Sequence, residues 1–165
     1  MKLTANLGMV LEKQVFLACD WYAARAIALI QKVPTSWQPE RRDGKIVGAH
    51  PEKKSTVDFL GTIGPDGRGI AFEAKEEESD RIKKSRVEPH QAKFLNMFAR
   101  CGGLTFVMVS FYKLNRFFRI PYPAWESWQS SSVSVSDCEK IGDEIFLWDQ
   151  NRRLGFLEGL VNGQS

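Results

Sequence analysis

The chain has 165 residues, of which 43% are hydrophobic and 26% charged, a balance that fits one folded domain and excludes wholesale disorder. The longest largely apolar stretches have about eight residues, far short of the roughly 20 of a membrane-spanning helix, and the N-terminus has no apolar segment typical of a secretory signal. Three widely spaced cysteines argue against a disulfide framework and favour a reducing cytoplasm. The net charge of +3 permits nucleic-acid binding, and the excess lies in residues 1–60, which contain nine Lys or Arg against six Asp or Glu.

Residues 7–30 are expected to form one long helix, because apolar residues recur there at spacings of three and four. Pro34 ends any such helix. The segment 34–54 is rich in proline, glycine and charge, so we predict an excursion from the core, with the more apolar run 45–49 forming part of a hairpin.

Two strands follow, at 55–62 and 68–75, and each alternates between apolar and polar residues. The sequence Gly-Pro-Asp-Gly at 64–67 is a strong turn signal, so the two strands should form a hairpin. The remaining segments are expected to be a charged loop (76–86), a helix (89–100), a buried strand (104–111), its partner strand (116–120) and a loop with a short helix near Trp125 (121–136). Residues 137–165 show no clear pattern.

The predicted hairpin brings two carboxylates together. If Pro65 and Asp66 are the central residues of the turn, Asp58 lies directly opposite Glu73, with Cβ atoms about 4.5 to 5.5 Å apart. Two carboxylates at that separation repel each other unless a cation or a proton lies between them, and Mg²⁺ prefers such oxygen ligands. A bulge at the turn would shift this register by one residue.

Lys75 should share a strand face with Glu73, and Thr56 should lie opposite Lys75. An ammonium beside a metal-bound water and a phosphate can stabilise developing charge or orient the nucleophile. The alternative for Glu73 and Lys75 alone is an ordinary ion pair at a strand edge. The placement of Asp58 opposite Glu73, with apolar residues flanking both strands, favours the functional interpretation.

Two further polar residues fall on apolar helix faces. Glu12 shares a face with Phe16 and Cys19, where a carboxylate needs a partner or a metal. The alternative is a glutamate near a helix start, where the helix dipole favours it. Gln91 shares a face with Leu95 and Phe98, and its alternative is a polar residue of the first helical turn.

The order and content of these motifs resemble RecU-type Holliday-junction resolvases of the PD-(D/E)xK nuclease superfamily. The similarity runs from about Gly8 to Pro121. It is carried by Leu11-Glu12 and Tyr22 in the first helix, Ser55-Thr56-Val57-Asp58-Phe59, Phe72-Glu73-Ala74-Lys75, His90-Gln91 and Gly102-Gly103-Leu104-Thr105-Phe106.

The resemblance implies a homodimer that binds four-way DNA and makes paired, symmetric nicks with Mg²⁺ or Mn²⁺. It implies that Asp58 and Glu73 hold metal and that Lys75 assists the attacking water. Thr56, Glu12 and Gln91 would complete the site.

The resemblance also implies a stalk that projects from the core at 34–54. We expect its basic residues to contact phosphates near the centre of an open junction and its tryptophan to stack on an exposed base. The alternative is a solvated loop with the tryptophan packed back on the core. The residues concerned are Arg41, Arg42, Lys45, Lys53, Lys54 and Trp37.

Together these patterns predict a single α/β nuclease domain over residues 1–165, with a restriction-endonuclease-like core in which helices flank a mixed central sheet. The expected activity is magnesium-dependent resolution of four-way junctions in recombination and repair, in the cytoplasm of a bacterium or of the bacterial host of a phage. No membrane association or nucleotide cofactor is expected. The alternatives are a related nuclease acting on other branched or duplex DNA and a non-catalytic DNA-binding subunit.

Overall fold

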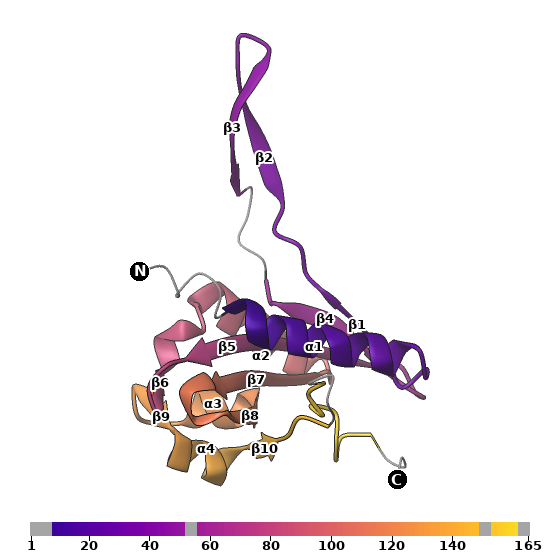
Figure 1. Cartoon of the computed structure of the whole chain (residues 1–165), viewed down its shortest axis with the longest axis vertical. Coiled ribbons are helices and arrows are strands. Elements are labelled where there is room, and N and C mark those ends of the chain that lie inside the picture. Colours follow the sequence, from indigo (N-terminus) through magenta and orange to yellow (C-terminus); the bar gives the residue numbers. More distant parts are fainter. Residues whose placement is uncertain (1–7, 52–55, 149–152, 162–165) are drawn as a thin grey trace.

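The computed structural model describes residues 8–51, 56–148 and 153–161. A six-stranded sheet forms its centre, with the strand order β1–β4–β5–β7–β8–β10 (Figure 1). The β5–β7 pair is parallel and the other neighbours are antiparallel, so the sheet is mixed, as predicted. In chain order the elements are α1 (Gly8–Ala23), β1 (Ala28–Lys32), β2 (Trp37–Arg42), β3 (Lys45–Pro51), β4 (Phe59–Ile63), β5 (Arg68–Glu77), β6 (Arg81–Lys83), η1 (Lys84–Arg86), α2 (Pro89–Arg100), β7 (Leu104–Phe111), η2 (Tyr112–Leu114), β8 (Arg116–Pro121), α3 (Tyr122–Ser127), β9 (Ser132–Ser134), α4 (Val135–Ile141) and β10 (Asp143–Ile145).

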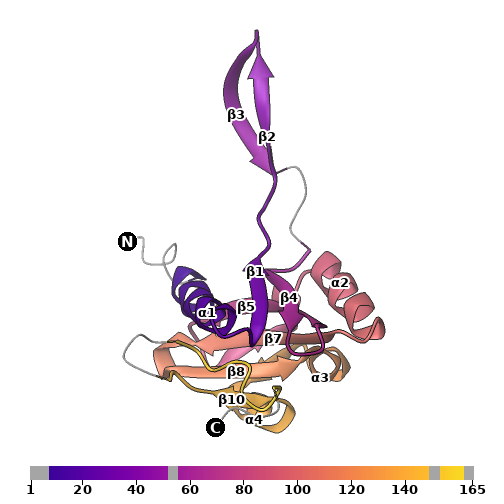
Figure 2. The same cartoon turned by 90° about the vertical axis from the view of Figure 1, so that its right-hand side faces the viewer.

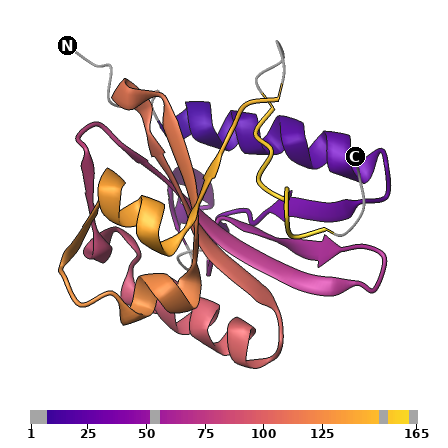
Figure 3. The ribbon, with the colours of Figure 1, turned by 90° about the horizontal axis from the view of Figure 1, so that it is seen from below.

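Helices cover both faces of the sheet, as the view in Figure 3 shows, with α1 on one side and α2 and α3 on the other. On the α1 face, Phe72 stacks between Phe59 and Phe106, with ring centroids 4.9 and 4.5 Å apart. On the α2 face, Leu95 of α2 and Trp125 of α3 join a second buried cluster. Alternation along β5 therefore gives two separate cores, one on each side of the sheet.

The predicted helix over 7–30 is wrong at its end, because α1 stops at Ala23. A turn follows in which Ala26 has a left-handed φ of 54°, and the chain then reverses into β1. Ile27 and Ile30 fit the helical spacing, but Ile27 lies in the turn and Ile30 in β1. Both are buried in the core on the α1 face of the sheet. Pairing of β1 with β4 has overridden the helical propensity of this segment.

The predicted hairpin is confirmed, and its register is the expected one, with Phe59 opposite Phe72. Its first strand is shorter than expected, because β4 begins only at Phe59. Val57 consequently packs in the α2-face core and does not share a face with Phe59. The second strand, β5, continues to Glu77, past the expected Lys75.

Further along the chain, the helix at 89–100 and the strand at 104–111 are confirmed at their predicted ends. The partner strand is confirmed but extends one residue further, to Pro121, and a short helix over Tyr122–Ser127 contains Trp125. The segment 76–86, predicted to be a charged loop, contains the short strand β6. This strand pairs with β9, at Ser132–Ser134. None of the helices in the described ranges is long and apolar enough to cross a membrane.

The described part of the segment 137–165, which shows no clear sequence pattern, contributes to the core. Leu154 and Phe156 are fully buried against the α1 face. The guanidinium of Arg119, itself buried on β8, donates to the carbonyl oxygens of Phe156 and Glu158 and pairs with Asp143 at 2.7 Å. One cation thus ties the C-terminal segment and β10 to the sheet.

Strands β2 and β3 form a separate hairpin that projects from the core (Figures 1 and 2). Its tip is the pair Asp43-Gly44, both with positive φ, as a two-residue type I′ turn requires. Every residue of β2 is exposed. The hairpin is inserted between β1 and β4, and the backbone N–H of Val33 donates to the carbonyl of Asp58 at 2.8 Å, which closes its base.

Candidate active site

The candidate active site lies at the start of β4 and the second half of β5. Because Phe59 pairs with Phe72, Asp58 lies opposite Glu73, as predicted. The backbone N–H of Asp58 donates to Oε1 of Glu73 at 3.2 Å, and the N–H of Ala74 donates to Oδ2 of Asp58 at 2.9 Å. These crossed hydrogen bonds hold both carboxylates against the backbone of the neighbouring strand.

The ammonium of Lys75 faces both carboxylates. Its Nζ lies 2.7 Å from Oε2 of Glu73 and 4.0 Å from Oδ2 of Asp58. The Glu73 side chain is fully buried and that of Lys75 is only 14% exposed, so this is not the solvated ion pair of the alternative interpretation. The Lys75 amino group thus lies within reach of two carboxyl groups in a largely dry environment.

Glu73 is difficult to ionise in this environment. Burial, to which the Asp58 carboxylate adds, raises the pKa of Glu73 from 4.5 to about 8, while Lys75 acts in the opposite direction. A single ammonium therefore compensates the two carboxylates only in part. A site with this charge balance favours additional positive charge.

The donor set fits a hard divalent cation. Carboxylate oxygens of Asp58 and Glu73 both lie near the Lys75 ammonium, and such oxygens are the ligands that Mg²⁺ and Mn²⁺ prefer. Within the described ranges, no group of three or more His, Cys, Asp or Glu residues is arranged to hold a metal ion. Mg²⁺ usually retains several waters and needs only one or two carboxylates, so two are sufficient.

Thr56 and Gln91 are placed less directly. Thr56 is exposed and lies ahead of β4, so the strand register does not extend to it. Gln91 is buried on α2, which packs against the face of β5 that carries Glu73, and its side-chain oxygen accepts a hydrogen bond from the backbone of Glu88 at 2.9 Å. That bond is half of a capping box that starts the helix.

Glu12 lies on α1, on the opposite side of the sheet from Lys75. It forms an ion pair with Lys32, the last residue of β1. The next residue, Val33, binds the backbone of Asp58, so Glu12 lies near the base of the site without sharing its face. The predicted need for a partner is therefore met by a lysine.

A neighbouring carboxylate, Glu76, was not predicted from the sequence. Its Oε1 accepts a hydrogen bond of 2.6 Å from the backbone N–H of Leu11, in the first turns of α1. Burial raises the pKa of Glu76, the hydrogen bond from Leu11 lowers it, and the charge of Glu12 raises it further. The Glu76 carboxylate, carried by β5, thus binds a backbone N–H in the N-terminal part of α1. The one sequence signal for a role of Glu76 is its position directly after Lys75.

The predicted DNA-contacting residues lie on the β2–β3 hairpin. Arg41 and Arg42 end β2, Lys45 begins β3 beside the tip, and Trp37 is exposed at the base of β2. The tryptophan is therefore not packed on the core. The other two residues, Lys53 and Lys54, lie outside the described residues.

The hairpin register separates its side chains into two faces. One face has Trp37 and Pro39 on β2, with Ala49 opposite Pro39 and Ile46 opposite Arg41. The other face is polar and carries Gln38, Glu40, Arg42, Lys45 and His50. The hairpin thus presents an apolar face with one arginine and a hydrophilic face with two cations near its tip.

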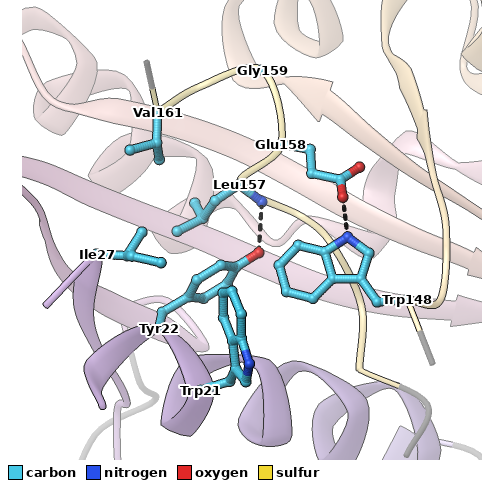
Figure 4. Close-up of a pocket in the computed structure, with 8 residues that line it drawn as sticks. All are labelled: Trp21, Tyr22, Ile27, Trp148, Leu157, Glu158, Gly159 and Val161. Atoms are coloured by element: carbon cyan, nitrogen blue, oxygen red, sulfur yellow. Dashed lines mark hydrogen bonds between the residues drawn. The ribbon is translucent and has the colours of Figure 1, made fainter. Parts of the chain in front are cut away.

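A separate cavity of about 290 Å³ lies where the end of α1 meets the C-terminal segment (Figure 4). Its polar groups already have partners: the backbone N–H of Leu157 donates to the Tyr22 hydroxyl at 3.2 Å, and the Trp148 indole donates to Glu158. Trp21 lies ten residues along α1 from Leu11, or about 15 Å at the helical rise. The cavity is therefore distant from the carboxylates and reflects the anchoring of the C-terminal segment.

Comparison with known proteins identifies the family. The sequence model for Recombination protein U matches residues 6–161, which extends the similarity well beyond Pro121. The chain belongs to the RecU family. A relative from Listeria innocua, named Holliday junction resolvase RecU, is 32% identical over 93% of this chain and 82% of its own length. A Streptococcus gordonii relative of the same name is 34% identical over 72% of this chain and 62% of its own length.

The fold also resembles that of a solved structure. The solved structure of Hjc from Archaeoglobus fulgidus, a Holliday junction resolvase, matches with a TM-score of 0.51 over 82% of this chain and 94% of that one. Only 16% of the aligned residues are identical, so the match concerns the fold alone. It agrees with the predicted restriction-endonuclease-like core.

Proposed function

We propose that this protein is an endonuclease that resolves four-way DNA junctions during recombination and repair. The observation that carries the proposal is the convergence of Asp58, Glu73 and Lys75 in a member of the RecU family. The bacterial relatives are named Holliday junction resolvases, which supports the same substrate here. The three cysteines of the described chain are free thiols, consistent with a cytoplasmic protein of a bacterium or its phage.

In the proposed reaction, the three residues act on the scissile phosphate and on a water molecule. Lys75 is held in place by Glu73 and Asp58, so its ammonium is oriented before the substrate arrives. It would stabilise the negative charge that develops on the phosphate and orient the attacking water. Because the site is little exposed to solvent, the interaction of the Lys75 ammonium with the phosphate charge is weakly screened and therefore strong.

Asp58 and Glu73 would hold Mg²⁺ or Mn²⁺. Such an ion, when bound, supplies a water of lowered pKa and neutralises charge on the phosphate. The raised pKa of the buried Glu73 indicates that Lys75 alone does not compensate its negative charge, and a divalent cation would add the missing positive charge. Thr56, Gln91 and Glu12 remain candidate supporting residues around the pair.

The β2–β3 hairpin, which lies within the expected stalk at 34–54, would contact the junction. Its tip cations suit phosphates, and the exposed Trp37 suits stacking on an unpaired base. Resolution needs two nicks in symmetric strands, and the described part of the chain has one such site, so we propose a homodimer. No nucleotide cofactor is needed for this hydrolysis.

The experiment is cleavage of a four-way junction beside duplex, flap and single-stranded DNA of matched sequence, with and without Mg²⁺. Paired nicks in the junction that require the metal are expected, together with their loss in Asp58→Asn. Preferential cleavage of flap or duplex DNA would instead indicate a related nuclease. Tight junction binding without any cleavage would indicate a non-catalytic subunit.

A further inference from the structure

The second half of β5, which carries the candidate active site, has one edge beyond the end of β4. In the described part of the chain, β4 pairs with β5 only as far as Phe72, whereas β7 pairs along β5 to its last residue. The N–H of Ala74 points to the β4 side, where it binds the Asp58 carboxylate. Because backbone groups alternate along a strand, the carbonyl of Glu76 faces the same edge.

The side chain of Arg86 lies at this edge. Its Nη2 donates to the carbonyl oxygen of Glu76 at 3.1 Å, and its Nη1 donates to Oε2 of Glu77 at 3.2 Å. Side chains two residues apart share a strand face, so Glu77 lies on the same face of β5 as Lys75. The guanidinium is therefore at the edge of β5 and on the side of the sheet that carries the candidate active site.

Arg86 lies one step along the strand from the carboxylate of Asp58. Asp58 binds the edge at Ala74 and Arg86 binds it at Glu76, and two residues of a strand span about 7 Å. The free edge thus presents a carboxylate and then a guanidinium, in that order along β5.

The turn η1, which carries Arg86, is held firmly to the core. Ile82 before the turn and Val87 after it are buried in the cluster on the α2 face. Nζ of Lys84 donates to two backbone carbonyl oxygens at the end of α3, at 3.0 and 2.7 Å. The guanidinium therefore has a fixed support and a fixed orientation before any ligand arrives, which lowers the entropic cost of binding one.

The guanidinium can bind a further group. Its side chain is 46% exposed, and an arginine has more N–H donors than the two contacts with β5 use. Three consecutive glutamates, at 76–78, repel an approaching phosphate. Lys113 pairs with Glu78, and Arg86 places a second cation among these carboxyl groups, at the edge next to the active site.

We propose that Arg86 binds the phosphate next to the scissile one on the cleaved strand, and so positions the scissile phosphate at Asp58, Glu73 and Lys75. The inference rests on the proposed function, in which those three residues act on the scissile phosphate. A planar guanidinium suits this task because its parallel N–H groups match two oxygens of one phosphate. Glu77 is a positioning residue, because it holds the guanidinium in its orientation.

Binding of four-way junction DNA in EDTA, at several salt concentrations, is the first test. Arg86→Ala should raise the dissociation constant about 10-fold and reduce the slope of its salt dependence by about 0.9, the contribution of one phosphate contact. Arg81→Ala is the matched control, because Arg81 is an exposed arginine of β6 whose side chain donates to Ser132 and not to β5. The control should bind as wild type does; equal losses in both variants would overturn the inference.

Junctions with one neutral methylphosphonate, placed in turn at each phosphate near the crossover, identify the phosphate that Arg86 contacts. At one position beside the cleaved bond, neutralisation should weaken binding and slow cleavage about 10-fold for wild type and for Arg81→Ala, with no further loss for Arg86→Ala. Arg86→Lys should restore binding only in part, because an ammonium lacks the parallel donors. If wild type and Arg86→Ala are equally sensitive at every position, the inference is wrong and the nuclease assignment is unaffected.

The competing explanation is that Arg86 only stabilises the edge of β5. In that case Arg86→Ala lowers the thermal midpoint and the cleavage of every junction, while its sensitivity to each neutral phosphate stays that of wild type, which would overturn the inference. If Arg86→Ala does not fold, Arg86→Gln replaces it in the same comparison, since its amide can still donate to the Glu76 carbonyl. Coupling of Arg86 to one phosphate without cleavage by any protein would refute the proposed function and retain the phosphate contact.

Discussion

Replacement of Glu73 by glutamine should change how the stability of the metal-free protein depends on pH. The folded-state pKa of Glu73, about 8, lies above its ordinary value of 4.5, so the folded protein retains a proton that the unfolded chain releases. The stability associated with this proton is fully present below about pH 4.5 and is lost as the pH rises through about 8. Glutamine fills the same volume and does not titrate.

The magnitude follows from the shift. At about 1.36 kcal/mol per pKa unit, the free energy of unfolding of wild type should fall relative to that of Glu73→Gln by on the order of 4 kcal/mol between pH 4.5 and pH 9. Urea denaturation of both proteins at pH 5 and pH 9, in the presence of EDTA, measures this difference.

The control is Glu78→Gln, which removes a carboxylate that is exposed and paired with Lys113. This variant should not gain stability at high pH. If the stability difference between Glu73→Gln and wild type is the same at pH 5 and pH 9, Glu73 is already ionised in the folded protein and the electrostatic account of the site is wrong.

Three further predictions concern cleavage and DNA binding. Asp58→Asn should abolish cleavage in Mg²⁺ while junction binding stays equal or becomes tighter, because a charge that repels phosphate is removed; activity within a few-fold of wild type would exclude Asp58 from the site. Lys75→Ala should lower turnover by about 100-fold with little change in affinity in filter binding, whereas equal losses would indicate a phosphate-positioning role. Replacing Gln38–Gly44 by a glycine link should leave the thermal midpoint unchanged but weaken the preference for four-way over duplex DNA, and neutralising Arg41 and Arg42 should flatten the salt dependence of binding. A shortened protein that selects junctions as wild type does would contradict the role of the hairpin.

The parts of the fold that were predicted well have strong local signals. A proline in the first turn and Gly102-Gly103 after the end delimit α2. The turn at 64–67 fixed the β4–β5 register, and with it the approach of Asp58 to Glu73. The C-terminal segment has no such signal, because its burial depends on Arg119 and on the sheet that it covers.

The parts that were not predicted depend on tertiary contacts. Residues 23–26 favour a helix, and Ile27 and Ile30 fit either a helix or a strand, so only the pairing with β4 decides their conformation. The same applies to the site. The partner of Glu12 is Lys32, twenty residues away, and the partner of Glu76 is the backbone of Leu11, and neither pairing follows from spacing along the chain.

The way in which the β2–β3 hairpin joins the core has an evolutionary consequence. Its two ends are held together by the hydrogen bond from Val33 to Asp58. Directly before Val33 and after Asp58, strands β1 and β4 pair with each other in the core sheet. Changes of length or composition in the hairpin therefore do not alter the register that positions the carboxylates. Selection can modify the part of the protein that meets the substrate without disturbing the part that performs the chemistry, so relatives should diverge in this hairpin sooner than in β4 and β5.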